Sequence, residues 1–143
     1  MAGTKMIIDA TNLILGRLAS KAAKQALGGE EVIVINCEKA IVTGDRKHIF
    51  DSYIAKFDIG QVNQGPYFPR KPDQLVRRTI RGMLPRKKPK GMSAFERVKC
   101  YIGTPSEIKA EAKSLPEASG DRIKKTSHIT VLELCKHIGY TGK

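Results

Sequence analysis

Residues 5–36 read KMIIDATNLILGRLASKAAKQALGGEEVIVIN and predict a strand, a helix and a second strand in succession. The segments Lys5–Asp9 and Val32–Asn36 are short and apolar, and the second is almost entirely β-branched, as expected for a strand covered on both faces. Between them, apolar side chains recur at helical spacing at Leu15, Leu18, Ala19, Ala22 and Ala26. Such a succession forms a βαβ unit, so we expect two parallel strands joined by a right-handed crossover.

The ends of this predicted helix carry their own signals. Thr11 or Asn12 is the expected N-terminal cap, and Gly28-Gly29 offers a left-handed stop. Gly16, near the start of the helix, is interpreted as a point of close packing on the sheet.

The rest of the chain continues the alternation. We expect a strand at Ala40–Thr43, a helix through Ile49–Phe57, a loop at Gln61–Pro72, a helix at Asp73–Leu84 and the last strand at Val98–Ile102. Capping boxes predict further helix starts at Ser93–Glu96, Thr104–Glu107 and Thr130–Glu133. The predicted fold class is therefore α/β, in a single domain over residues 1–143 with a C-terminal helical appendage over residues 104–143.

Composition narrows the kind of protein. The chain has 143 residues, of which 41% are hydrophobic and 28% charged, which suits one folded domain rather than a disordered chain. No apolar run approaches the ~20 residues that span a membrane, and no apolar signal region follows Met1–Lys5. Cys37, Cys100 and Cys135 are widely spaced and form no C-x-x-C pair, so we expect no disulfide framework and a reducing, cytoplasmic location.

Positive charge is concentrated in one segment. The formal net charge is +12, and residues 61–92 contribute +8 of it, with Asp73 as their one acidic residue. Such a block favours a polyanionic partner, most often nucleic acid. A solvated basic arm without a partner is less favoured, because the block also holds apolar residues at helical spacing. In the same block, Tyr67 and Phe68 either stack on an unpaired base or, as we favour, anchor the loop on the domain.

The basic segment divides into a helix and a loop. On a helical wheel, three arginines share one side and three apolar residues the other: Arg77, Arg78 and Arg81 against Val76, Ile80 and Met83. We expect the apolar side to pack on the sheet and the three guanidinium groups to face outward. Pro85, Pro89 and Gly91 are expected to interrupt the helix. A constrained, projecting loop would then present the next four cations to RNA phosphates: Arg86, Lys87, Lys88 and Lys90.

The chain lacks the motifs of catalysis and cofactor binding. Residues 9–18 hold one glycine where the dinucleotide-binding fingerprint needs three, and neither a G-x-x-x-x-G-K-[ST] nor a G-x-S-x-G motif occurs. Cys135 and His137 are two residues apart, so they cannot face one metal ion from a regular helix. We interpret one cysteine and three carboxylates as structural residues: Cys37, Asp9, Glu38 and Asp45. We therefore predict no catalytic residue, no metal site and no cofactor.

Six short segments recur in a characteristic order. They are IIDA (7–10), LGRLAS (15–20), VIVINCEK (32–39), VTG (42–44), RGMLP (81–85) and VKCYIG (98–103). In this order and spacing they resemble the universal "L thirteen" family of large-ribosomal-subunit proteins. The resemblance covers about residues 6–104, and RGMLP followed by a basic stretch and an apolar strand is its strongest marker.

The resemblance implies a three-layer α/β/α fold around a small, mainly parallel sheet of about four strands, with basic loop extensions. It implies a structural protein without enzymatic activity, membrane contact or small-molecule substrate. Such a protein binds large-subunit rRNA beside neighbouring ribosomal proteins in the cytoplasm and joins the subunit early in assembly. The marker places rRNA contacts at Arg86, Lys87, Lys88 and Lys90. Arg17 matches a family position that serves RNA binding, packing or a salt bridge. Four more cations complete the candidate RNA-binding set: Arg46, Lys47, Arg70 and Lys71.

Several segments point to the archaeal branch of that family. Gly28-Gly29 leads directly into the second strand without the long insertion typical of bacterial relatives, and residues 65–70 resemble archaeal and eukaryotic members. Residues 126–140 look archaeal, and the long basic extension of eukaryotic relatives is not seen. Two alternatives stay open: a small Rossmann-like nucleotide-binding protein or enzyme with an incidental basic patch, and an RNA-binding regulator outside the ribosome.

Overall fold

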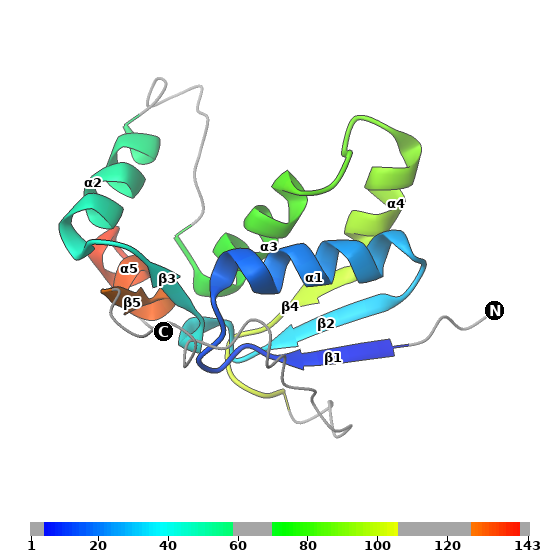
Figure 1. The fold of residues 1–143 in the computed structure, drawn as a ribbon, viewed down its shortest axis with the longest axis horizontal. Coiled ribbons are helices and arrows are strands. Elements are labelled where there is room, and N and C mark those ends of the chain that lie inside the picture. Colours follow the sequence, from blue (N-terminus) through cyan, green and yellow to red (C-terminus); the bar gives the residue numbers. More distant parts are fainter. Residues whose placement is uncertain (1–4, 59–69, 106–126, 141–143) are drawn as a thin grey trace.

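The computed structural model describes residues 5–58, 70–105 and 127–140 (Figure 1). Its strands are β1 (Lys5–Asp9), β2 (Glu31–Ile35), β3 (Ile41–Thr43), β4 (Val98–Cys100) and β5 (His128–Thr130). Its helices are α1 (Leu15–Leu27), α2 (Arg46–Phe57), α3 (Pro72–Gly82), α4 (Pro89–Glu96) and α5 (Val131–His137), with a short 3-10 helix, η1, at Cys37–Lys39. No helix within these ranges is long and apolar enough to cross a membrane.

The main sheet is parallel and has the strand order β1-β2-β4. The predicted βαβ unit is confirmed, because β1 and β2 pair in parallel along their full lengths with α1 between them in the chain. Strand β4 joins the other side of β2, with Val34 beside Cys100. The connections from β1 to β2 and from β2 to β4 move in the same direction across the sheet. If both are right-handed, as such connections are, their helices lie on the same face. Figure 1 shows α1, α3 and α4 on that face, and the predicted α/β class with a small, mainly parallel sheet is confirmed.

The core lies between these helices and the sheet. From the strands, Ile8, Val32, Val34 and Val98 are buried against the helices. All the apolar positions predicted for α1 are buried as well: Leu15, Leu18, Ala19, Ala22 and Ala26. The opposite face of the sheet carries a smaller apolar cluster made of Ile7, Ile33 and Ile35 with Tyr101 beside them.

A separate two-stranded sheet was predicted only in part. The strand expected at Ala40–Thr43 is β3, and it pairs antiparallel with β5 rather than joining the main sheet. The strand predicted at Val98–Ile102 is present as β4 over Val98–Cys100, but it is not the last strand, because β5 comes later in the chain. Three residues are too few to show a strand periodicity. The capping box at Thr130 is confirmed, since its hydroxyl accepts a hydrogen bond from the Glu133 N–H at 3.2 Å and begins α5.

The ends of α1 differ in how well they were predicted. The expected cap by Thr11 or Asn12 is wrong: Thr11 turns back so that its N–H and hydroxyl both donate to the Asp9 carboxylate, at 3.0 and 2.7 Å, and α1 begins later without a side-chain cap. The predicted left-handed stop is confirmed at Gly29, which has a φ of +96°. The close packing expected at Gly16 is wrong, because a Cβ there would contact nothing within 4 Å.

Helix α3 begins one residue earlier than predicted. Pro72 was assigned to the preceding loop, but it occupies the first turn of α3, where a residue without an N–H is favoured. Three predicted features lie outside the described residues: the loop at 61–69, the contacts of Tyr67 and Phe68, and the helix expected after Thr104–Pro105.

Candidate nucleic-acid interface

Helix α3 carries the arginine-rich segment and is held by its apolar face. Leu75, Val76 and Ile80 are buried, so the apolar side predicted at Val76 and Ile80 is confirmed. Met83 does not belong to it and is 44% exposed. Because α3 ends at Gly82, the chain leaves the helical register there, and Leu84 is buried instead.

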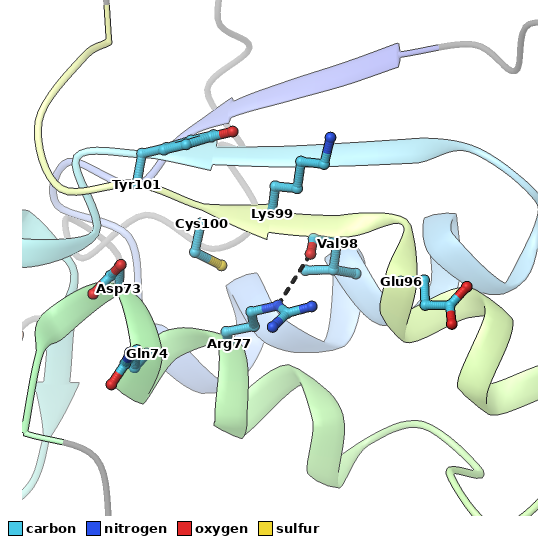
Figure 2. Close-up of a pocket in the computed structure, with 8 residues that line it drawn as sticks. All are labelled: Asp73, Gln74, Arg77, Glu96, Val98, Lys99, Cys100 and Tyr101. Carbon is cyan, nitrogen blue, oxygen red and sulfur yellow. Dashed lines mark hydrogen bonds between the residues drawn. The ribbon is translucent and has the colours of Figure 1, made fainter.

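Arg77 was predicted to face outward, but this prediction is wrong. Its side chain instead contacts β4 at the edge of the sheet and links α3 to that strand (Figure 2). Its Nε donates a hydrogen bond to the Val98 carbonyl at 3.1 Å, and its guanidinium lies 4.1 Å from the centre of the Phe95 ring. In the described part of the chain, β4 is an edge strand, so its outward carbonyl takes its donor from a side chain. The guanidinium of Arg77 is therefore engaged by the fold.

Three other arginines lie close together at the end of α3. Arg78 and Arg81 are half-buried, and Arg86 is exposed just beyond the helix. The pKa of Arg81 is lowered from its ordinary value, first by burial and then by the charges of Arg78 and Arg86. The three positive charges repel one another, so an anion bound among them is favoured.

The chain after α3 forms a tight turn. The Arg86 N–H donates to the Leu84 carbonyl at 2.8 Å, and the Lys88 N–H donates to the Pro85 carbonyl at 2.9 Å. Backbone hydrogen bonds thus hold residues 84–88 in one compact conformation. The predicted projecting loop is confirmed over these residues only.

A helix follows where helix breakers were expected. Helix α4 begins at Pro89 and contains both Gly91 and Ser93, so the predictions that Gly91 interrupts a helix and that Ser93 starts one are wrong. Proline at the first helical position sacrifices no hydrogen bond. A Cβ on Gly91 would overlap the carbonyl of Pro85 and lie 2.8 Å from the backbone nitrogen of Arg86. Glycine is needed there because the tight turn packs directly on α4.

The turn and α4 present four exposed cations. Arg86, Lys87 and Lys88 lie on the turn as predicted, whereas Lys90 lies in the first turn of α4. With the two arginines of α3 they form what we call the basic turn surface: Arg78, Arg81, Arg86, Lys87, Lys88 and Lys90. Its cations stand on two helix ends and a hydrogen-bonded turn, so the backbone positions from which they extend are set by the fold.

The remaining predicted cations lie elsewhere. Arg46 and Lys47 are exposed in the first turn of α2, which lies at the opposite end of the molecule from α4 in Figure 1. The guanidinium of Arg46 lies 5.3 Å from the centre of the Phe50 ring. Arg70 and Lys71 are exposed just before α3, and Arg17 is exposed on α1. The structure therefore does not bring these five residues into the basic turn surface.

Two exposed methionines beside the basic turn surface were missed as surface residues. Met83 follows α3, and Met92 on α4 is 58% exposed. Helical spacing could have identified Met92 as a surface residue. Gly91 and Ala94 are three residues apart and define the buried side of α4, so Met92 lies on another side of the helix. Flexible, polarizable methionine side chains adapt to irregular partner surfaces.

The carboxyl ends of the strands, where α/β enzymes bind substrates, hold polar groups that satisfy one another. The Asp9 carboxylate accepts hydrogen bonds from Thr11 and from the Asn36 side chain, and a Glu38 oxygen accepts from the Gly103 N–H at 3.0 Å. Burial raises the pKa of Asp9, but these hydrogen bonds and the charge of Lys39 outweigh it and leave the pKa below its ordinary value. Asp9 and Glu38 thus have hydrogen-bond partners within the fold, as their structural interpretation leads us to expect. The described strands of the main sheet follow the order β1-β2-β4, without the reversal at which doubly wound folds bind nucleotides.

Comparison with known sequences identifies the family. A family model described as "Ribosomal protein L13" matches residues 4–107. The chain belongs to the ribosomal protein L13 family. The match includes the main sheet, α1 to α4 and the whole basic turn surface, while β5 and α5 follow it.

Archaeal L13 proteins are similar to this chain over most of its length. The "Large ribosomal subunit protein uL13" of Methanopyrus kandleri is 44% identical over 137 residues, which cover 94% of this chain and 86% of the relative. That of Methanocaldococcus jannaschii is 44% identical over 137 residues, covering 93% and 96%. That of Archaeoglobus fulgidus is 41% identical over 138 residues, covering 95% and 88%. The resemblance drawn from six short segments, and its archaeal character, are confirmed.

Proposed function

We propose that this L13 family member is a structural constituent of the large ribosomal subunit, which binds large-subunit rRNA through the basic turn surface and supports early subunit assembly. The observation that carries the proposal is the cluster of six cations held on α3, the tight turn and α4. Curated relatives of similar length are named as large-subunit proteins, which supports a place in the cytoplasmic ribosome beside other large-subunit proteins. In this role the chain binds and positions RNA and catalyses no reaction.

The binding mechanism follows from the charges. Burial is the largest cause of the lowered pKa of Arg81, and the charges of Arg78 and Arg86 add to it. Phosphates bound between the three arginines offset their mutual repulsion. Each phosphate contact also releases counterions from the RNA, which supplies most of the affinity. Because these cations stand on a backbone that is already hydrogen-bonded, binding costs side-chain ordering but little backbone ordering. Planar guanidinium groups add bidentate contacts that lysine does not make.

The affinity for large-subunit rRNA fragments is expected to depend steeply on salt. With about six phosphates neutralised, the logarithm of the association constant should fall with the logarithm of salt concentration at a slope between about −4 and −6. Filter binding or fluorescence anisotropy over a salt series measures the slope. A slope near zero would contradict the electrostatic mechanism. In cell extracts, the protein should sediment with large subunits and leave them only in concentrated salt.

Arg77 is expected to support stability rather than RNA binding. Replacing Arg77 with methionine should lower the free energy of unfolding by about 1–3 kcal/mol, because the Val98 carbonyl loses its donor. The comparison variant Arg86→Met removes the same charge from an exposed side chain of the basic turn surface, and it should destabilise less and weaken rRNA binding more. Denaturant unfolding and RNA titration of both folded variants measure the two effects. Equal losses of affinity at unchanged stability would show that Arg77 faces the RNA after all.

A further inference from the structure

Two cysteines from distant parts of the chain meet beneath α3. Cys37 begins η1, and Cys100 ends β4. The N–H of Cys37 donates to the Tyr101 carbonyl at 3.3 Å, and its thiol donates to the Val34 carbonyl at 3.7 Å. Since Val34 stands directly beside Cys100 in the sheet, the sulfur of Cys37 lies near the side chain of Cys100.

The two thiols differ in their access to solvent. Cys37 is completely buried, whereas Cys100 is half-buried and lines a cavity of about 310 Å³ between α3 and β4. Figure 2 shows the Cys100 side chain on the side of β4 that faces α3, with Asp73 and Arg77 opposite, while Lys99 and Tyr101 point to the other side. A small solute entering this cavity therefore meets Cys100 before Cys37.

Burial and neighbouring groups favour the protonated form of the Cys37 and Cys135 thiols. For Cys37, a hydrogen bond with Cys100 and burial raise the pKa far above its ordinary value. Burial and the charge of Asp73 raise the pKa of Cys135, on α5, to about 12. Thiolates are the reactive form, so Cys37 and Cys135 do not react first with an oxidant. Cys37 nevertheless lies beside Cys100, the cysteine that lines the cavity.

We propose that Cys37 and Cys100 form a peroxide-sensitive pair that closes to an intramolecular disulfide. A hydroperoxide transfers its terminal oxygen to the sulfur of Cys100; the O–O bond breaks, leaving a sulfenic acid on Cys100 and an alcohol or water. The sulfur of Cys37 then attacks the sulfur of Cys100, the S–O bond breaks, and the proton of Cys37 leaves with the hydroxyl group as water. Two thiols are thereby oxidised by two electrons and one peroxide is reduced. The new bond ties η1 to β4 directly under the helix that carries Arg78 and Arg81.

The test exposes the full-length protein to hydrogen peroxide, alkylates the remaining thiols with iodoacetamide in denaturant, and maps the digest by mass spectrometry. The expected product contains Cys37 linked to Cys100 within one chain, with Cys135 alkylated. The matched control Cys135→Ala should form the same bridge, and Cys100→Ser should form none. In a Cys37→Ala variant the reaction should stop at the Cys100 sulfenic acid, which dimedone traps.

Any of four results with the unaltered protein would overturn the proposal. They are a disulfide to Cys135, disulfides only between chains, oxidation of Cys100 without a disulfide, and no loss of thiols at peroxide levels that oxidise free cysteine. The measurement involves no RNA, so its result stands apart from that of the salt series.

Discussion

Replacing Arg86, Lys87 and Lys88 together with alanine is expected to lower the affinity for large-subunit rRNA about 50- to 200-fold at ~0.15 M salt. At that concentration each phosphate contact contributes a factor of roughly five through counterion release, and the three factors multiply. All three side chains are exposed on the tight turn, so the free energy of unfolding should change by less than about 0.5 kcal/mol per residue. The magnitude of the salt slope should fall by about two to three units.

A matched triple variant distinguishes this surface from net charge alone. Lys5, Lys24 and Lys39 are also exposed but lie outside the basic turn surface, so alanine at these positions removes the same total charge. RNA titrations of both triple variants over one salt series, with circular dichroism as the check on folding, make the comparison. If the two variants lose the same affinity, the protein binds RNA through its overall charge and the proposed surface is wrong.

Replacing Gly91 with alanine is expected to lower the free energy of unfolding by about 1–3 kcal/mol, although alanine favours helices over glycine. The added Cβ would overlap the carbonyl of Pro85 and approach the nitrogen of Arg86 to 2.8 Å. Both are backbone atoms, so no side-chain rotation relieves the contact and the turn moves away from α4. Since the turn carries Lys87 and Lys88, the affinity for rRNA should fall even under conditions where the variant is folded.

Gly82, the last residue of α3, supplies the control for this variant. A Cβ there would contact nothing within 4 Å, so Gly82→Ala should keep or raise the stability, by up to about 1 kcal/mol. Thermal or urea unfolding of the two variants side by side measures the difference. Equal stability of the two variants would show that the turn does not press on α4 at Gly91.

Much of the candidate site was visible in the sequence because charge density is a property of neighbouring residues. Five of the six cations in the basic turn surface lie on the helix or the loop to which the sequence assigned them: Arg78, Arg81, Arg86, Lys87 and Lys88. Arg77 shows the limit of this reasoning. A helical wheel places it beside Arg78, yet its partners lie 18 and 21 residues further along the chain, in α4 and β4. Its orientation depends on which segment packs next to α3.

The same distinction divides the rest of the fold. Some features depend only on residues that are close in the sequence, so local patterns specified them. They are the helical spacing in α1, the β-branched run of β2, the stop at Gly29 and the cap at Thr130. Other features depend on how the helices and strands pack together. They are the close approach of Gly91 to Pro85, the pairing of β3 with β5 and the proximity of Cys37 to Cys100. Residues far apart in the chain enter these contacts only after the helices have covered one face of the sheet. Composition and periodicity therefore specified a basic α/β protein, and tertiary packing selected which of its cations face outward and which serve the fold.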